Sequence, residues 1–351
     1  MKICFLCHNI CSYGGTERIV SSVSRKFKNL GFDCYALSMG KKEKLFFDFS
    51  AFLMIDYLYR TGNRIAVMHD RVKKIRNFLI ENDIDVLITV GGHLNYYGWR
   101  SKGKCRWIAW DHEMFDFNKS FYVKFSKYIG VKKADKIVAL TDYDKNRYAE
   151  TYRNSENKVV VIGNFTENYH VKEKKGNNIV VTAGRLWNIK QFDLLIEAWA
   201  IICKEVSDWK LIILGEGTER NKLESLVKKY NMENVLLPGN KKNINEYYEA
   251  ADIFTITSTA EGFSLVLLEA MAHSLPIVGF RSNGGVEELV DDNNGILVRQ
   301  GDVSSLAEAL RVMIKNPQKQ EMMGNASYKK SLKFAPQTII DKWIKLLKNI
   351  E

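Results

Sequence analysis

The sequence contains no long apolar run. The first apolar stretch after Lys2 covers only residues 3–7 and stops at His8 and Asn9, whereas a secretory signal needs about 7 to 15 apolar residues and a cleavage site. No later stretch approaches the roughly 18 uninterrupted apolar residues of a membrane-spanning helix. We therefore expect a soluble, cytoplasmic protein.

Cysteine and histidine are not spaced as in a metal or redox site. The six cysteines are scattered along the chain. Residues 4–8 match C-x-x-C-H, which is the sequence motif of a haem attachment site. Residues 2–7, however, have the composition of a buried parallel strand, on which Cys4 and Cys7 point to opposite faces and cannot hold the same haem or metal. Zinc-ligand spacing is also absent, so we expect no bound metal and no cofactor.

The second half of the chain has no net charge. Residues 166–351 carry 24 Lys and Arg against 24 Asp and Glu, whereas residues 1–165 carry 28 against 17, so the whole net charge of +11 belongs to the first half. Such a one-sided excess predicts an electropositive face for an anionic partner, which could be nucleic acid, a phosphorylated substrate or an anionic membrane.

Apolar strand-like segments alternate with amphipathic helical segments along the chain, without internal repeats. With 351 residues and 46% hydrophobic residues, the chain is long enough for two domains. The strand candidates are residues 2–7, 34–38, 86–90, 106–110, 136–140 and 158–162, and, beyond a polar linker at 164–178, residues 178–184, 209–215, 234–239, 252–258, 275–280 and 295–298. This alternation predicts two doubly wound α/β domains in tandem, followed by a last helix that begins at Pro336.

Two sites have the features of an anion-binding turn. Gly14 and Gly15 stand between the first strand and a helix, where backbone N–H groups and the positive helix end can meet an anion. The segment lacks GxGxxG and the P-loop pattern, so an ordinary tight turn is the alternative.

The second site contains two cations. Arg185 follows a strand and Lys190 begins a helix. Together with the glycine turn they could clamp a diphosphate, with solvated surface charges as the alternative.

Two carboxylates, Glu261 and Glu269, are eight residues apart. The second lies in the helical pattern LVLLEAMA, so both can face one site only if Glu261 lies in the loop before that helix. Carboxylates in such positions can bind the hydroxyl groups of a ribose and of a sugar. Burying Glu269 without a partner would cost several kcal/mol, so we expect it to have a partner or a ligand.

These segments, in this order, resemble the family 4 glycosyltransferases of the GT-B type over almost the whole chain. The matching pieces are SYGGTERIV, AGRLWNIKQFDLLIEAW, LIILGEGTERNKLE, VLLPGN, ADIFTITSTAEGFSLVLLEAMAHSLPIVGF and NGGVEELVDDNNGILVRQGDVSSLAEAL. The resemblance implies two Rossmann-like domains facing a cleft: an acceptor-binding domain at 1–165 and a nucleotide-sugar-binding domain at 166–335. A C-terminal helix at 336–351 would return to the first domain.

The resemblance also implies roles for individual residues. Gly14 and Gly15 would approach the donor phosphates, and Arg185 and Lys190 would neutralise the diphosphate leaving group. Glu269 would hold the ribose. The transferred sugar would be held by Glu261 and the residues that follow it, and the base would lie near the loop after VLLP; these positions are Gly262, Phe263, Ser264 and Leu265, and Gly239 and Asn240.

A histidine near the transferred sugar is a further expectation from the family. His112 follows a strand of the first domain and so lies at the edge of the sheet where α/β sites form. Asp111 and His93 are the competing candidates. The DxD spelling at residues 83–85 lies where a helix is expected to end and a strand to begin, and the GT-B type needs no such metal motif.

The expected activity is the retaining transfer of a hexose or N-acetylhexosamine from a nucleotide-diphosphate sugar, with UDP as the expected nucleotide. The acceptor would be a saccharide or a polyprenyl-diphosphate-linked molecule in bacterial surface polysaccharide synthesis, such as lipopolysaccharide or capsule. An epimerase or a phosphorylase on the same fold is the nearest alternative. A basic nucleic-acid-binding protein is a more distant one, because it leaves the paired carboxylates unexplained.

A lipid-linked acceptor would bring the basic first half to an anionic membrane, so we expect peripheral attachment to the inner face of the cell membrane. The candidate cations are Arg71, Lys73, Lys74 and Arg76 on one helix and Lys124, Lys127, Lys132 and Lys133 around another. Residues 41–60 place aromatics beside lysines, which suits either a membrane interface or an ordinary strand with a solvated loop.

Overall fold

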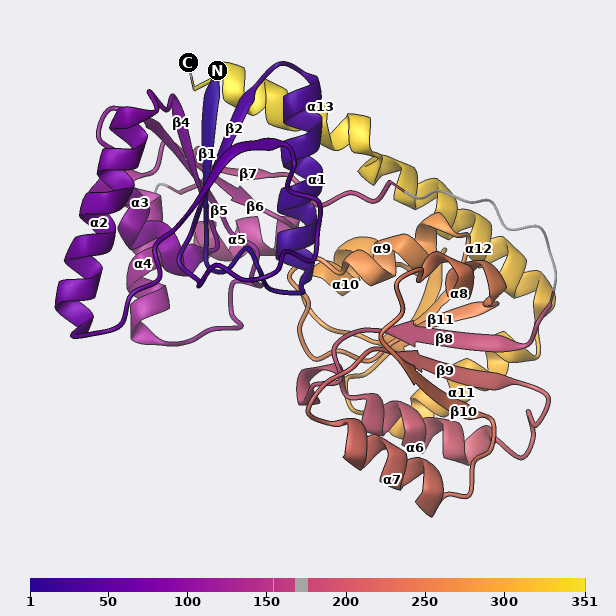
Figure 1. The fold of residues 1–351 in the computed structure, drawn as a ribbon. Helices are drawn as coiled ribbons and strands as arrows, with labels where there is room; N and C mark the ends of the chain where they lie inside the picture. The colour runs from indigo at the N-terminus through magenta and orange to yellow at the C-terminus, as the bar shows by residue number, and fades with distance from the viewer. Residues whose placement is uncertain (154, 168–175, 351) are drawn as a thin grey trace. The chain divides into compact units, whose positions relative to one another are not determined.

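The computed structural model describes residues 1–153, 155–167 and 176–350. These residues form two compact units, which are shown in Figure 1. Unit 1 consists of Met1–Asn164 and Gln337–Glu351, and unit 2 consists of Phe165–Pro336. Residues 168–175, the middle of the predicted linker, lie outside the described residues.

Unit 1 is built on a parallel sheet of seven strands in the order β3-β2-β1-β4-β5-β6-β7. Its strands are β1 (Lys2–Cys7), β2 (Asp33–Ser38), β3 (Phe52–Tyr57), β4 (Val86–Val90), β5 (Arg106–Trp110), β6 (Lys136–Ala139) and β7 (Val159–Val161). Six of them are the predicted strands, and β3 lies in the segment 41–60 that the sequence left open. Except at the edge strand β3 and the short β7, these strands are almost continuously buried, which accounts for their unbroken apolar runs.

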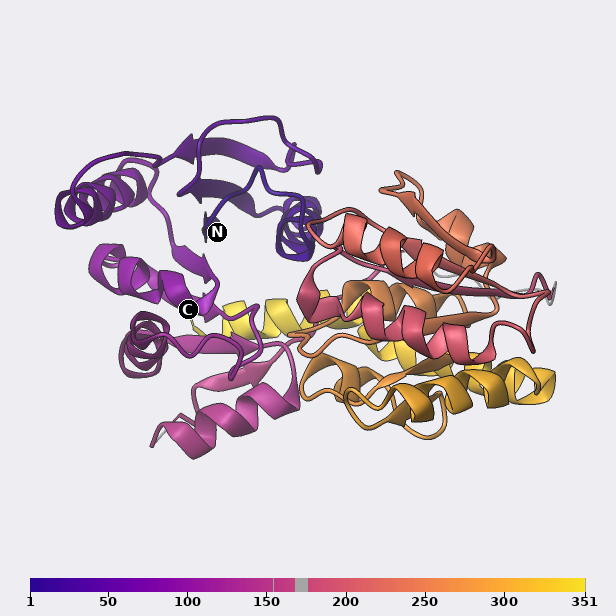
Figure 2. The same ribbon diagram turned by 90° about the horizontal axis from the view of Figure 1, so that it is seen from below.

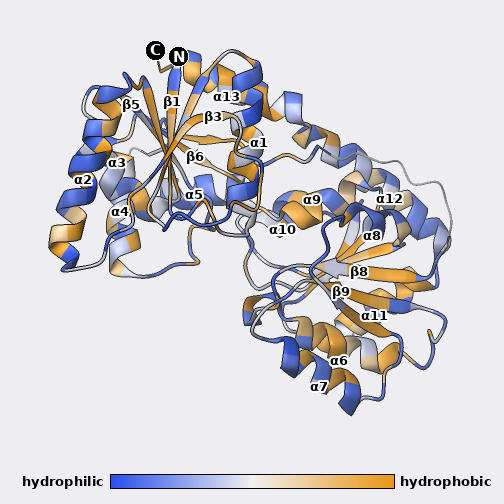
Figure 3. Cartoon of the chain, viewed as in Figure 1, coloured by the Kyte–Doolittle hydropathy of each residue, from blue (hydrophilic) through white to orange (hydrophobic). Residues whose placement is uncertain are grey.

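Unit 2 is built on a parallel sheet of six strands in the order β10-β9-β8-β11-β12-β13. Its strands are β8 (Ile179–Ala183), β9 (Lys210–Leu214), β10 (Val235–Gly239), β11 (Ile253–Ile256), β12 (Ile277–Phe280) and β13 (Gly295–Val298). All six were predicted. Figure 3 shows the strands of both units as mostly apolar, in agreement with their burial.

Helices cover both faces of each sheet. Those of unit 1 are α1 (Gly15–Asn29), α2 (Arg64–Glu81), α3 (Asn95–Ser101), α4 (Phe121–Lys133), α5 (Asp142–Thr151) and α13 (Pro336–Lys348). Those of unit 2 are α6 (Phe192–Ile202), α7 (Arg220–Lys229), α8 (Asn245–Ala250), α9 (Leu265–Ala272), α10 (Gly285–Leu289), α11 (Val303–Ile314) and α12 (Pro317–Ser331). Short 3-10 turns occupy Gly92–Leu94, Asn188–Lys190 and Leu332–Phe334. In unit 2, α6, α7 and α11 lie on one face and α8, α9 and α12 on the other (Figures 1 and 2).

The last helix, α13, packs on unit 1. Trp343 has no exposed surface. Its ring centroid lies 6.1 Å from that of Phe27 on α1 and 4.9 Å from that of Trp110 on β5. Ile339, Ile340, Leu346 and Leu347 are buried on the same side of the helix. The predicted return of the final helix to the first domain is confirmed.

The C-x-x-C-H spelling at residues 4–8 is part of the buried strand β1. Cys4 lies in the core formed with α2 to α5, and both Cys4 and Cys7 are free, buried thiols. Burial raises the pKa of both thiols, so neither is a thiolate at neutral pH. The interpretation of these cysteines as core residues is confirmed. The DxD spelling at residues 83–85 joins α2 to β4, and the Asp85 carboxylate accepts a hydrogen bond from the backbone N–H of Lys2.

Candidate functional site

Both predicted cations of unit 2 and the carboxylate of Glu261 follow strands at which the strand order changes direction. β8 lies between β9 and β11, so the chain leaves β8 toward one side of the sheet and later returns to place β11 on the other side. In open parallel sheets, ligands bind beyond the carboxyl ends of the strands at such a switch point. Arg185 and Lys190 follow β8, and Glu261 follows β11. The strand order therefore places all three at the position typical of a binding site.

Lys190 and Glu261 form an ion pair, with 2.6 Å between Nζ and Oε1. Both side chains are largely buried. The pair is positioned by the chain after β11, because the Thr257 hydroxyl donates to the Lys190 carbonyl at 2.7 Å and the Thr259 N–H donates to the Ile189 carbonyl at 2.8 Å. Two residues 71 positions apart in the sequence are thus joined by a side-chain hydrogen bond, and contacts between the chain segments after β8 and β11 support it.

Arg185 is exposed on the loop that follows β8. Its guanidinium lies over the ring of Trp187, with 4.1 Å between Cζ and the ring centroid. The loop is held from the other side by the end of β9, where Gly215 has a φ of +136° and approaches the Gly184 carbonyl so closely that a Cβ atom would lie 1.9 Å from the oxygen. A side chain at Gly215 would therefore displace the loop that carries Arg185.

Glu261 begins the loop that leads into α9, as the spacing of the two carboxylates required. Gly262 and Phe263 continue the loop, Ser264 precedes the first helical residue, Leu265, and the backbone N–H groups of the first turn have no partners within the helix. The Ser264 hydroxyl is buried and makes no hydrogen bond within the part of the chain that the structure describes. The loop thus offers N–H donors, a hydroxyl and the positive end of a helix beside the Lys190 ion pair.

The chain after β12 supports this loop. The N–H of Gly285 donates to the Glu261 carbonyl at 2.8 Å, and Glu261 and Gly284 form an isolated parallel bridge. A Cβ atom on Gly285 would lie 2.7 Å from the Cα atom of Phe263. Only glycine allows this close approach, so Gly285 helps to fix the position of Glu261.

Glu269 lies on α9 and has no exposed surface. The hydroxyl of Tyr248, on α8, donates to Glu269 Oε2 at 3.4 Å. The expectation that this carboxylate has a partner is confirmed. A ligand hydroxyl that reached Glu269 would join or replace the Tyr248 hydroxyl.

Gly239 is the last residue of β10, and Asn240 follows it. Gly239 is buried and its carbonyl accepts from the Gly215 N–H at 3.1 Å, whereas Asn240 is exposed. The ends of β8, β9 and β10 are therefore joined through the loop at Gly215. Gly239 and Asn240 lie at the same edge of the sheet as Arg185.

Gly14 and Gly15 stand at the start of α1, after β1. Gly14 precedes the helix in an extended conformation, with φ of −149°, and neither glycine has a positive φ. Backbone strain therefore does not explain glycine at these two positions. Close approach of a ligand to the backbone is the explanation that the sequence suggested, and it stays a prediction.

Two histidines meet at the switch point of unit 1, between β1 and β4. His8 follows β1 and His93 follows β4, and their rings form an edge-to-face contact with 5.1 Å between centroids. Burial, together with the charge of His8, lowers the pKa of His93 to about 4, so its imidazole is neutral at physiological pH. His93, a competing candidate in the sequence, thus lies at the central position of this edge.

His112 follows β5, one strand further along. Its ring centroid lies 4.2 Å from that of Trp110, and its Nε2 atom is buried with no hydrogen-bond partner among the described residues. Burial lowers the pKa of His112 to about 3, although the Asp111 carboxylate acts in the opposite direction. His112 is therefore a neutral imidazole whose Nε2 atom is buried and makes no hydrogen bond among the described residues.

Replacing His112 with asparagine is expected to change how stability depends on pH. Unfolded histidine titrates near pH 6.5, and folded His112 stays neutral down to about pH 3. Lowering the pH from 7 to 5 therefore protonates His112 only in the unfolded chain, which decreases the free energy of unfolding of the wild type. We expect this decrease to be about 2 kcal/mol larger in the wild type than in H112N. Urea unfolding of both proteins at each pH measures this difference. A difference that does not change with pH would show that His112 is accessible to protons in the folded state.

Asp111, the other competitor, is engaged in a buried ion pair. Lys127 Nζ lies 3.0 Å from Asp111 Oδ2, with only 3% and 5% of the two side chains exposed, and the Tyr148 hydroxyl donates to the same oxygen at 2.7 Å. Burial alone would raise the pKa of Asp111, but Lys127 and Tyr148 hold it below its usual value. Asp111 therefore helps to fix the start of the loop after β5, which contains His112.

The same contact corrects one membrane prediction. Lys127 was grouped with Lys124, Lys132 and Lys133 as a membrane-facing cation, but its ammonium points into the core of unit 1 because α4 packs that side against β5. Arg71, another predicted membrane-facing cation, also makes contacts within the protein, since its guanidinium donates hydrogen bonds to the carbonyls of Leu58 and Met39.

Several residues of the site were not assigned from the sequence. The residues that contact or position the predicted ones are Tyr248, Thr257, Gly284, Gly285 and His8. A usable signal existed for the glycines, because a Gly-Gly pair between a strand and a helix occurs at 284–285 as it does at 14–15. Tyr248 had no such signal, because its contact with Glu269 depends on how α8 packs beside α9.

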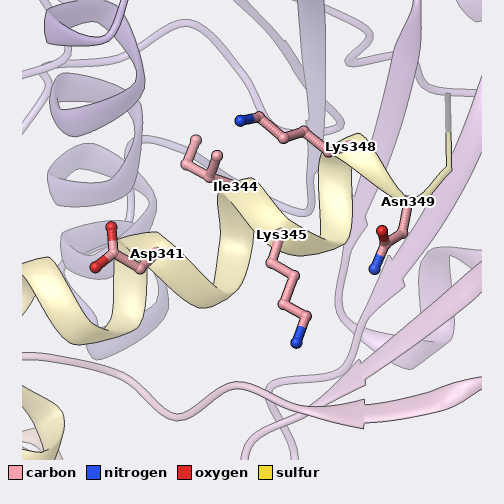
Figure 4. Close-up of a pocket in the computed structure, with 5 residues that line it drawn as sticks. All are labelled: Asp341, Ile344, Lys345, Lys348 and Asn349. Carbon is pink, nitrogen blue, oxygen red and sulfur yellow. The ribbon is translucent and has the colours of Figure 1, made fainter.

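A hollow lies beside α13. It is lined by Asp341, Ile344, Lys345, Lys348 and Asn349 (Figure 4). These residues include none of the predicted site residues, and their mixed charges indicate no particular ligand.

Comparison with known proteins agrees with the fold and with the motifs. The family described as "Glycosyltransferase Family 4" matches residues 13–167, and the family described as "Glycosyl transferases group 1" matches residues 164–330. An uncharacterized glycosyltransferase of Haemophilus influenzae is 30% identical over 97% of this chain and 98% of its own length. The chain therefore belongs to the family 4 glycosyltransferases of the GT-B type.

Other similar proteins carry more specific names. The amylovoran biosynthesis glycosyltransferase AmsD of Erwinia amylovora is 27% identical over 99% of both chains. A Campylobacter jejuni N-acetylgalactosaminyltransferase, named for an acceptor saccharide linked to diphospho-undecaprenol, is 31% identical over 52% of both chains. The structure of Anabaena HepE in complex with UDP has a TM-score of 0.84 at 18% identity and covers 99% of this chain and 100% of that one, which shows the shared fold.

Proposed function

We propose that this glycosyltransferase moves a hexose or N-acetylhexosamine from a UDP-sugar to a saccharide or polyprenyl-diphosphate-linked acceptor, with retention of the anomeric configuration. Surface polysaccharide assembly is the proposed setting. The observation that carries the donor part is the arrangement of Arg185, Lys190 and Glu261 at the switch point of unit 2, beside the N-terminus of α9. The names of the relatives support the glycan setting, and the UDP complex of HepE supports the choice of nucleotide.

The chemistry of these groups suits departure of a nucleoside diphosphate. In the proposed step the bond between the anomeric carbon and the diphosphate oxygen breaks, and the acceptor oxygen forms a bond to that carbon on the same face. The acceptor proton passes to an oxygen of the leaving diphosphate. Arg185 and Lys190 would stabilise the negative charge that develops there, and such electrostatic stabilisation is usually the largest single contribution to catalysis.

The remaining residues have positioning roles in this proposal. Glu269 would accept hydrogen bonds from the ribose hydroxyls, because a buried carboxylate beside the Tyr248 hydroxyl is a strong acceptor. Glu261 and the N–H groups of Phe263 and Ser264 would hold the transferred sugar. His112 would contact the sugar as a neutral imidazole. Its role, like those of Gly14 and Gly15, rests on the family resemblance.

Nucleotide binding tests the donor part directly. A ligand at a hundred times its dissociation constant should stabilise the folded protein by about 2.7 kcal/mol. We expect UDP to raise the thermal midpoint of the wild type more than GDP, ADP or CMP, and we expect R185A and E269A to lose that shift. Stabilisation by a different diphosphate would replace UDP as the donor nucleotide, and no shift with any of the four would contradict the proposed clamp.

Product analysis tests the reaction. With the stabilising UDP-sugar and a saccharide acceptor, we expect UDP release and a glycoside whose anomeric proton has the configuration of the donor in NMR spectra. The rate should be unchanged in EDTA if the reaction needs no metal. A free sugar epimer or a sugar phosphate as the product would assign the protein to epimerases or phosphorylases instead.

A further inference from the structure

The helix α4 presents an aromatic surface to solvent. Phe121 is 84% exposed, and Tyr122, Phe125 and Tyr128 are 43%, 45% and 45% exposed. Phe121, Phe125 and Tyr128 recur at spacings of four and three residues, so they form one stripe along the helix. The rings of Phe121 and Phe125 are parallel, with 6.3 Å between centroids. α4 packs against α3 on one side of the sheet of unit 1 (Figure 1).

The buried side of α4 is unusually polar. Lys127 pairs with Asp111, and the Ser126 hydroxyl donates to the Gly92 carbonyl at 2.7 Å. Gly130 lies so close to Asn95 that a Cβ atom would be 2.7 Å from the amide nitrogen. These contacts fix which side of α4 faces the sheet, so the aromatic stripe is directed outward although apolar residues usually face the core.

The surface around the stripe is basic. Lys119, Lys124, Lys132 and Lys133 are exposed on α4 or just before it, and residues 117–133 contain no Asp or Glu. Of the two carboxylates that flank this segment, Asp116 pairs with Arg147 at 2.8 Å and Asp135 pairs with Lys102 at 3.4 Å. Lys132 lies over the ring of Tyr128, with 5.7 Å to the centroid. Aromatic side chains interleaved with lysines are typical of a helix that lies in the interface of an anionic bilayer.

We propose that the exposed side of α4, comprising Phe121, Tyr122, Lys124, Phe125, Tyr128, Lys132 and Lys133, docks on an anionic lipid membrane. The inference extends the proposed function, since a lipid-linked acceptor requires the enzyme to work at a bilayer. The helix has 13 residues, which is a length of about 20 Å at 1.5 Å per residue. It therefore lies along the membrane surface. No helix among the described residues is long and apolar enough to cross the membrane.

The other candidates from the sequence fit a membrane less well. On α2, Arg71 donates to two carbonyls, Arg76 donates to the Arg100 carbonyl, and Lys74 lies 3.7 Å from Asp70. In the segment 41–60, exposed apolar and aromatic side chains are also present, at Phe46, Leu53, Met54 and Tyr59. This segment, however, also contains the carboxylates of Glu43, Asp48 and Asp56. Only α4 combines exposed aromatics, several lysines and the absence of carboxylates among these three segments.

Vesicle flotation tests the proposal. We expect the wild type to float with phosphatidylglycerol vesicles and not with neutral phosphatidylcholine vesicles. F121S/F125S should reduce the floated fraction at least tenfold, and K124Q/K132Q should reduce it by a smaller factor that shrinks as salt is added. The matched controls are L53S/M54S, an exposed apolar pair on β3, and K73Q/K74Q, an exposed lysine pair on α2. Both controls should float as the wild type does.

Separate readouts distinguish this proposal from the proposed function. The UDP-induced thermal shift and the transfer to a water-soluble acceptor should be unchanged in F121S/F125S, which also shows that the variant is folded. Equal flotation of F121S/F125S and wild type, or equal binding to neutral vesicles, would overturn the docking surface even if UDP binds. Loss of a dimer in F121S/F125S, with no flotation of the wild type, would assign the stripe to contact between two copies of the chain.

Discussion

Replacing Lys190 with alanine is expected to lower kcat by roughly 10²- to 10³-fold, the loss typical when one preorganised electrostatic donor is removed from an active site. The Lys190 ammonium lies 2.6 Å from Glu261 at the switch point of unit 2. Its removal takes away a cation from the departing diphosphate and leaves the Glu261 carboxylate to repel it. Release of UDP under saturating donor and acceptor measures the effect.

The chain offers a matched control for this experiment. Lys222 is also in unit 2 and its Nζ atom also lies 2.6 Å from a carboxylate, that of Asp193, with Glu219 at 3.3 Å. The Lys222 side chain, however, is 53% exposed. K222A should keep kcat within twofold of the wild type. The double variant E261Q/K190A separates the loss of the Lys190 cation from the repulsion by the Glu261 carboxylate. It lacks the repelling carboxylate, so it should recover part of the kcat that K190A loses. A K190A enzyme with wild-type kcat would contradict the proposed role of Lys190.

Replacing Lys127 with methionine is expected to lower the free energy of unfolding of the protein by about 3–5 kcal/mol, because it leaves a buried carboxylate without its countercharge. Asp111 would keep the Tyr148 hydroxyl and the weaker backbone contacts from Gly92 and Glu113. These neutral donors do not balance a full negative charge in the interior. Urea unfolding at pH 7, followed by fluorescence, measures the loss.

Two variants show whether the lost charge is the cause. D111N/K127M removes both charges, and it should be more stable than K127M because the uncompensated carboxylate is gone. K124M changes an exposed lysine on the same helix and should alter stability by no more than about 0.5 kcal/mol. If K127M and K124M unfold at the same urea concentration, the Lys127–Asp111 pair does not stabilise unit 1.

The elements that the sequence predicted well are those whose local signals agree with their final surroundings. Residues 86–90 are an apolar run that forms a fully buried strand with the predicted bounds, because a strand covered on both faces can be apolar throughout. β3 was left open because an edge strand has one half-exposed face, and its sequence FLMIDY mixes apolar and polar residues in the way an interfacial segment would.

The candidate site was predicted in part. The sequence placed Arg185, Lys190 and Glu261 at strand ends because each follows an apolar run and precedes a helical pattern. It could not place Lys127, since the composition FYVKFSKYIGVKK is equally compatible with lysines and aromatics on either side of the helix. The buried partner Asp111, which lies on another element, determined that Lys127 faces inward and the aromatic rings face outward.

The sequence by itself determined the two α/β repeats, the strand ends that carry the charged residues and the loop position of Glu261, because these follow from local apolar patterns and helix geometry. Only the tertiary structure decided which strand ends are neighbours, so it alone joined Lys190 to Glu261, Tyr248 to Glu269 and His8 to His93. The physical reason is that strand order and side-chain packing arise from contacts between segments far apart in the chain, and no local pattern specifies which of the possible partners a buried charge will meet.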